Sequence, residues 1–119
     1  MPGVFRDIEL VYKGEAYTFT PTIRTMRGIE QTCEVSLSGM VMRATRGEFP
    51  MFDVAITYAA MLRAAGCASA DEDAVFLEMG SQSDTNPDGM SAYLDVIIRA
   101  ISPPEMDEKK AVASAEAES

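Results

Sequence analysis

The sequence contains no histidine and only two cysteines. Without histidine there can be no Ser-His-Asp or Cys-His catalytic pair, no histidine metal ligand and no ordinary proton shuttle near neutral pH. Two cysteines alone cannot complete the tetrahedral shell of a zinc ion. A glycine-rich phosphate loop is missing too, since RGEFP and GSQSDTNPDG lack a following Lys-Ser or Lys-Thr. We therefore expect no catalytic residues, no metal, no cofactor and no enzyme activity.

Long apolar runs are also missing, and none approaches the ~20 residues of a membrane-spanning helix. The first residues, MPGVFRDIE, lack a basic stretch followed by an apolar one, and glycine does not directly follow Met1. Neither a secretory signal nor myristoylation is expected from them. These features predict a cytoplasmic protein, in the host cell cytoplasm, with no membrane contact. In that compartment Cys33 and Cys67 are expected to be reduced and buried.

Basic residues are few: 10 lysines and arginines face 19 acids, for a formal net charge of -9. A field of this sign repels phosphate backbones, so no nucleic-acid binding is expected. The 119-residue length suits a single domain, and 47% hydrophobic residues can supply its core. The Ala-, Glu- and Ser-rich stretch 103–119 predicts a flexible, disordered acidic tail after a domain spanning 1–102.

A β-hairpin is expected near the start, in RDIELVYKGEAYTFT. Lys13-Gly14 fits a two-residue turn, because glycine supplies the positive φ that such turns require. Pairing across this turn sets Ile8 opposite Phe19 and Leu10 opposite Tyr17 on one apolar face. Two strands alone are marginal in water, so this face is expected to pack on helices.

The rest of the domain is expected to be a bundle of four to five short helices. The first begins at Pro21 with Thr20 as N-cap, and the second follows the cap residue Ser36 and ends at Gly47. The third, from about Pro50 to Ala65, is apolar on most of its circumference and belongs at the centre of the bundle. The predicted fold class is mainly α (α+β), an N-terminal hairpin packed on this bundle.

Caps and helix breakers delimit the last two helices. Ser69 to Glu72 fits a capping box, and its helix is expected to end at Gly80. A polar loop from Ser81 to Asn86 should follow, and then a helix from near Pro87 to the Pro103-Pro104 stop. The apolar stripes of the helices place these side chains among the buried ones: Ile23, Phe52, Leu77.

The sequence DTNPDG, at 84–89, matches the start of a calcium loop, with Asp95 at its twelfth position. However, Pro87 stiffens the loop, and Asp95 is shorter than the bidentate glutamate normally found there. A turn in which Asn86 or Asp84 caps the last helix explains the same residues. This loop is the sole support for a calcium-binding regulator or a small enzyme.

The chain has nine methionines, a residue type that suits adaptable protein-binding surfaces. Met42 falls off the main stripe of the second helix, and Phe49 and Met51 flank the connection at 47–50. These three residues are the candidate partner-binding residues. The alternative is that they are buried around the central helix, as apolar residues in such places usually are.

Several short motifs carry a resemblance to a known family. They are G-x-x-Y-T-F-T-P-T at Gly14–Thr22, Ile29-Glu30, V-S-L at Val35–Leu37 and L-R-A-A-G at Leu62–Gly66. Across about residues 6 to 102 the chain resembles the small tail-assembly chaperones of siphophage-like tails. The relatives in question are encoded in alphaproteobacterial prophages and gene transfer agents.

The resemblance implies a function without an active site. Such chaperones bind the tape-measure protein, help to recruit tail-tube protein onto it and leave the finished particle. Some relatives also have a longer form made by frameshifting. The alternative is a small structural tail component, a tube or connector protein retained in the particle, although tube subunits tend to be β-rich. A homo-oligomer is compatible with either role.

Overall fold

The computed structural model describes residues 7–85 and 89–101. In chain order the elements are β1 (Ile8–Tyr12), β2 (Glu15–Phe19), α1 (Ile23–Cys33), α2 (Leu37–Thr45), α3 (Met51–Ala64), α4 (Glu72–Thr85) and α5 (Gly89–Ile101). The predicted fold class is confirmed: the protein is mainly helical α+β, with an N-terminal hairpin. The tail expected at 103–119 lies outside the described residues.

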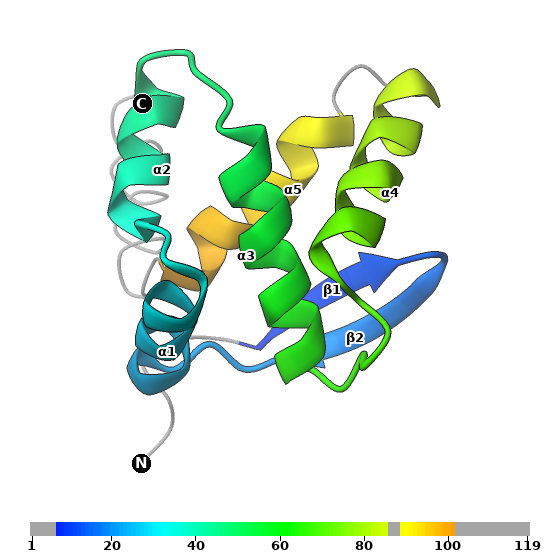
Figure 1. Cartoon of the computed structure of the whole chain (residues 1–119), viewed down its shortest axis with the longest axis horizontal. Coiled ribbons are helices and arrows are strands. Elements are labelled where there is room, and N and C mark those ends of the chain that lie inside the picture. Colours follow the sequence, from blue (N-terminus) through cyan, green and yellow to red (C-terminus); the bar gives the residue numbers. More distant parts are fainter. Residues whose placement is uncertain (1–6, 86–88, 102–119) are drawn as a thin grey trace, which may run out of the picture.

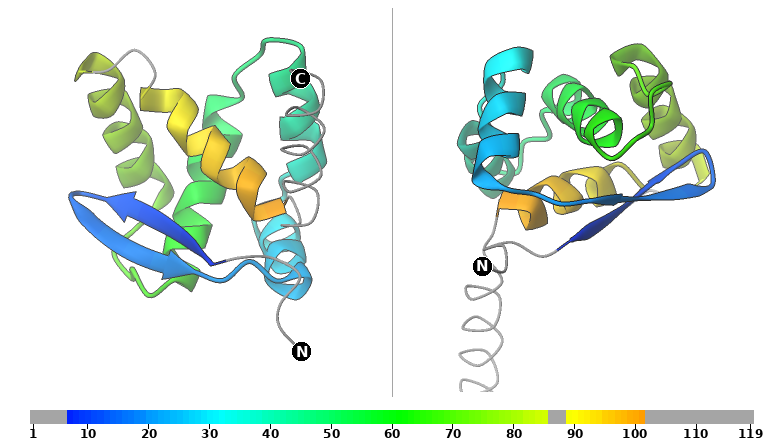
Figure 2. Two further views of the ribbon diagram at one scale, coloured as in Figure 1. Left: turned by 180° about the vertical axis from the view of Figure 1, so that it is seen from behind. Right: turned by 90° about the horizontal axis from the view of Figure 1, so that it is seen from below.

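Helix α3 stands at the centre of the molecule, with α1 and α2 on one side and α4 on the other (Figure 1). Helix α5 and the hairpin lie together beneath this layer (Figure 2). Contacts of α3 with α1, α4, α5 and β2 hold the arrangement together. The prediction that the apolar third helix occupies the centre is therefore confirmed.

The hairpin has the predicted turn and register. Lys13 and Gly14 both adopt positive φ, of 51° and 79°, as a tight two-residue turn requires. Ile8 pairs with Phe19 and Leu10 with Tyr17. The expected apolar face packs on the helices: Leu10 and Phe19 are buried, and Ile8 and Tyr17 are half-buried. Tyr12 of the same strand is buried as well.

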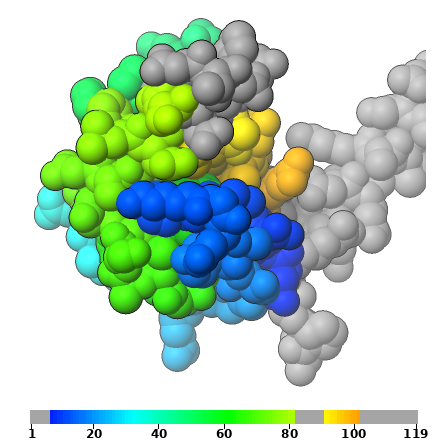
Figure 3. Space-filling model, turned by 90° about the vertical axis from the view of Figure 1, so that its right-hand side faces the viewer, coloured from blue at the N-terminus to red at the C-terminus, as the bar shows by residue number. Residues whose placement is uncertain are grey.

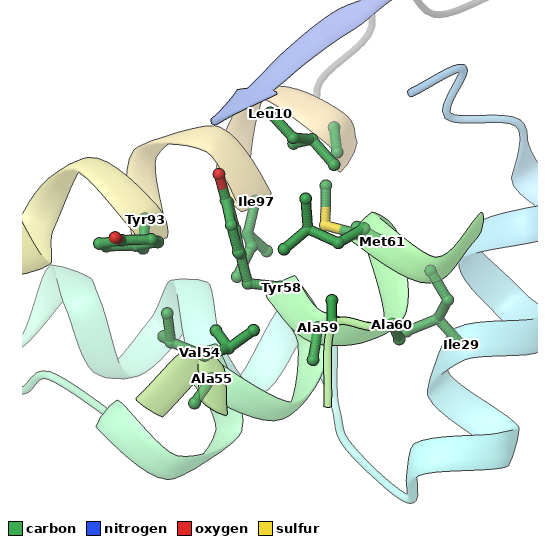
Figure 4. Close-up of a cluster of buried hydrophobic side chains, with 14 of the residues drawn as sticks. Leu10, Ile29, Val54, Ala55, Tyr58, Ala59, Ala60, Met61, Tyr93 and Ile97 are labelled. Carbon is green, nitrogen blue, oxygen red and sulfur yellow. The ribbon is translucent and has the colours of Figure 1, made fainter. Parts of the chain in front are cut away.

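Alanines give the core its close helix packing. Ala55 and Ala59 of α3 are buried beside Val54 and Met61, and their small side chains let neighbouring helices approach. Figure 4 shows these residues together with Leu10 of β1 and Ile97 of α5. Side chains from the hairpin and from the last helix thus meet on α3 in one core.

The start of α1 differs from the prediction. Thr22 is the N-cap, and its hydroxyl oxygen accepts a hydrogen bond from the Thr25 N–H at 3.1 Å. The Thr20 hydroxyl instead donates to Asp7 at 2.8 Å, and Pro21 is buried. Thr20 therefore anchors the end of the hairpin and does not cap the helix. The predicted cap of α2 is confirmed, because Ser36 accepts from the Gly39 N–H at 3.0 Å.

The predicted capping box of α4 is wrong. The carboxylate of Asp71 accepts the Ala74 N–H at 2.7 Å, while Ser69 belongs to a turn closed by the Ala70 N–H to Cys67 carbonyl bond. The helix also continues to Thr85, through the segment expected to be a loop. Packing of α4 against α3 and α5 outweighs the weak helix propensity of Gly80. Asn86 and Pro87 lie outside the described residues.

Both cysteines are free thiols, Cys67 buried and Cys33 only partly so. Over 7–85 and 89–101, no helix combines the length and the apolar character needed to cross a membrane.

Candidate protein-binding surface

The connection from α2 to α3 leaves a group of apolar side chains at the surface. Phe49, Met51 and Phe52 line a shallow hollow of about 300 Å³, together with Pro50. The hollow is edged by an ion pair between Arg43 of α2 and Asp53 of α3, with nitrogen and oxygen 3.3 Å apart. Phe49, Met51 and Phe52 are called here the Phe52 surface.

The three predicted partner-binding residues differ in exposure and in position. Met42 is 63% exposed and Met51 is 37% exposed, so burial around the core is wrong for both. Phe49 is half-buried and packs against the core. The structure brings Phe49 and Met51 together in the hollow, whereas Met42 lies outside it on α2. Partner binding by these residues stays a prediction.

Sequence reasoning missed the most exposed aromatic ring of this surface. Phe52 is 67% exposed, and its ring stacks on Phe76 of α4 with centroids 5.3 Å apart. The prediction that Phe52 is buried is wrong, because a residue in the first turn of α3 reaches the neighbouring helix instead of the interior. The stacked pair extends the apolar surface from α3 onto α4.

Leu77 of α4 was also expected to be buried and is 72% exposed. The buried residues of α4 are Val75 and Met79, which lie one turn apart on the same face. At 100° per residue, Leu77 falls about 200° from Val75 and so faces away from the core. This spacing was available in the sequence and could have identified Leu77 as exposed.

Charges around the Phe52 surface are largely balanced. The Arg43–Asp53 pair and the Arg46–Glu48 pair, at 3.6 Å, are both solvent-exposed. Such pairs contribute little to stability, about 0–1 kcal/mol. The apolar side chains therefore dominate what this surface offers to a partner.

Altered ionisation occurs away from this surface. Burial raises the pKa of Tyr58 to about 12 and raises the pKa of Tyr93 and of Cys33. The neighbouring hydroxyl of Tyr17 lowers the pKa of the Cys67 thiol. Within the described residues, no three or more of Cys, Asp and Glu are grouped so that they could hold a metal ion.

Fold and surface together define a small helical domain, with an N-terminal hairpin, that presents exposed apolar side chains suited to contacts between proteins. A family model described as phage tail tube protein, GTA-gp10, matches residues 6–100. The chain belongs to this family, and so to the proteins of phage or gene-transfer-agent tails. No curated protein and no solved structure is significantly similar to it.

The expected relation to phage and gene-transfer-agent tails is thereby confirmed. The finer expectation of a tail-assembly chaperone is not confirmed, because the description of the family names a tail tube protein and not a chaperone.

Proposed function

We propose that this protein is a small component of the tail tube of a phage-like particle or gene transfer agent, retained in the finished particle. The family match over 6–100 carries the proposal. In this role the protein acts by contact with other tail proteins and not by catalysis. The exposed apolar side chains of the Phe52 surface and of Leu77 supply area for such contacts.

A second candidate is a chaperone that binds the tape-measure protein and recruits tail-tube protein before it leaves the particle. The fold favours this role in one respect: the sheet in the described part of the chain has only two strands, whereas tube subunits tend to be β-rich. In either role the working site is a protein-binding surface.

Quantitative mass spectrometry of purified particles separates the two roles. A tube component is expected at many copies per particle, in constant ratio to the other tail proteins. A chaperone is expected in the producing cells and absent from the particles. Absence from particles that contain all other tail proteins would overturn the tube proposal and favour the chaperone.

A matched pair of variants tests whether the Phe52 surface is used. Phe52→Ser combined with Met51→Ser removes the two exposed apolar side chains of this surface and should lower tail assembly at least tenfold with little change in folding. Phe49 is unsuitable for this test because it packs against the core. Val11→Ser is the control, since Val11 is an exposed apolar residue of the hairpin. Normal assembly by the double variant would exclude the Phe52 surface as a site of contact.

A further inference from the structure

A second apolar feature lies across the molecule from α4. A groove of about 570 Å³ runs between α1, the start of α2 and the end of α5. Its apolar lining comes from Ile23, Met26, Leu37 and Ile101. Ile23 was expected to be buried, but it is 67% exposed at the edge of this groove. The volume falls within the range of roughly 300–1,000 Å³ that is typical of binding pockets.

The groove carries an available positive charge. Glu30 lines it, but its carboxylate accepts the Leu37 N–H at 2.9 Å and so is engaged at the N-terminus of α2, where the helix dipole favours an anion. Arg27 lines the groove and is exposed. No ion pair of Arg27 or of Arg24, one turn earlier, is found among the described residues. The groove is therefore apolar inside and cationic along α1.

Helix α4 has the complementary character. Leu77 projects from it, 72% exposed, next to the half-buried Phe76. Asp73 lies one helical turn before Leu77, and Glu72 precedes it in the acidic first turn. The sequence from Arg63 to Arg99 contains no other lysine or arginine. The outer face of α4 thus carries an exposed apolar side chain with acidic residues beside it. Figure 3 shows the side of the molecule on which α4 lies.

We propose that the groove between α1, α2 and α5 receives the Leu77 face of α4 from a second copy of this chain. Helices α1 and α2, which contribute most of the groove lining, lie on the opposite side of α3 from α4 (Figure 1), so both surfaces can be occupied in one molecule. The charges favour this partner, because the cationic α1 of one copy meets the acidic α4 of the next. A 14-residue helix is about 21 Å long and can cover the groove.

The contact joins two different surfaces, so each copy can bind one neighbour on either side. Such a head-to-tail contact produces a ring if the rotation closes and an open filament if it does not. The inference deepens the proposed tail role by naming the surfaces through which copies associate. The biological use of this contact rests on the proposed tail role. The contact itself does not, because it should form between copies of the purified protein.

Two single variants of the full chain test the contact. Leu77→Ser removes the projection, and Ile23→Ser opens the groove edge; both side chains are exposed, so folding should be kept. Each variant should weaken self-association by about tenfold or more, measured by sedimentation at protein concentrations up to about 100 μM. Mixed in equal amounts, the two variants should form a one-to-one dimer, because each retains the surface that the other has lost.

Val11→Ser should associate like the unaltered protein, and circular dichroism should show the same helix content in all variants. Arg27→Glu should weaken association several-fold, since it places an acid opposite the acids of α4. The alternative is a two-fold contact in which α4 of one copy meets α4 of the other. Leu77→Ser would abolish that contact and Ile23→Ser would leave it unchanged, and this pair of results would overturn the proposal.

Three further results would overturn the proposal. The first is that the unaltered protein stays monomeric, and the second is that the mixed variants stay monomeric. The third is that a synthetic peptide of residues 102–119 binds the groove and prevents association of the two copies. The last result would assign the groove to the segment that follows Ile101. The particle composition experiment is independent of all three, so failure of the tail-tube role and failure of this contact can be told apart.

Discussion

At the residue scale, Tyr58 has the most consequential polar contact in the core. Its hydroxyl donates to the Val11 carbonyl at 2.8 Å and accepts from the Val11 N–H at 3.0 Å. Figure 4 shows this hydroxyl directed toward β1. Its ring also meets Tyr93 edge to face, with centroids 4.8 Å apart. One side chain therefore joins α3 to β1 and to α5, and satisfies both backbone groups of Val11 on the edge of β1.

Tyr58→Phe should destabilise the protein by about 1–3 kcal/mol, because both backbone groups of Val11 lose their partner. The free energy of unfolding from urea titration measures this effect. Tyr12→Phe provides the contrast: Tyr12 is 3% exposed, and its hydroxyl has no hydrogen-bond partner among the residues that the structure describes. Its removal should change stability by less than about 0.5 kcal/mol or increase it. Equal losses in the two variants would contradict the assignment of the Tyr58 hydrogen bonds.

Alkaline pH should act on the same side chain. Burial raises the pKa of Tyr58 to about 12 from its ordinary value of 10.0, so the unfolded chain loses this proton at a lower pH than the folded protein does. The resulting stabilisation is complete below about pH 10 and is lost as pH rises toward about 12. Urea unfolding at about pH 8 and about pH 11 should therefore show a smaller loss for Tyr58→Phe than for the unaltered protein. Equal losses would show that Tyr58 does not contribute to the pH dependence.

At the element scale, the caps show how far local sequence determines helix boundaries. Ser36 was predicted correctly because its hydroxyl oxygen accepts the Gly39 N–H, and its other hydrogen-bond partner, the Ser38 hydroxyl at 3.4 Å, also lies in the first turn of α2. Thr20 and Ser69 were plausible caps by type, but each is held elsewhere: Thr20 by Asp7, and Ser69 within the turn at 67–70. A capping motif identifies residues that can cap, and the surrounding chain decides which residue does.

Replacement of Asp71 tests this assignment. Asp71→Ala should cost about 1 kcal/mol, since the Ala74 N–H loses its acceptor and the start of α4 loses a favourable negative charge. Ser69→Ala should cost clearly less, because Ser69 does not cap the helix. Thermal unfolding followed by circular dichroism compares the two. A larger effect for Ser69→Ala would restore the capping-box interpretation.

At the scale of the whole molecule, the central position of α3 limits the size of its side chains. Ala59 is fully buried, in a core assembled from the hairpin and the other helices. Ala59→Leu should destabilise the protein by about 1–3 kcal/mol or more, because the neighbouring elements cannot move apart without breaking their contacts. Ala64, exposed at the end of the same helix, is the matched site. Ala64→Leu should leave the urea midpoint nearly unchanged, and similar shifts at both sites would argue against α3 as the packing centre.

The sequence by itself determined the hairpin register, the order of the helices and the central place of α3. Each follows from a local pattern: a two-residue turn fixes which strand residues pair, and a helix that is apolar all round has no face to give to water. The family motifs were readable for the same reason, since they mark turns and helix ends. The relation to phage and gene-transfer-agent tails came from those motifs and not from any reactive residue.

Only the tertiary structure decided which apolar residues remain exposed. Ile23 and Phe52 satisfy the helical periodicity of buried positions closely enough to be assigned to the core, yet both are exposed. Leu77 differs from them, because its spacing from Val75 and Met79 already sets it on the opposite face of α4. Periodicity specifies a direction around a helix axis, whereas burial depends on whether another element lies in that direction and at that height. The docking of α3, α4 and α5 against one another fixes this, and so it fixes the surfaces that remain for partners.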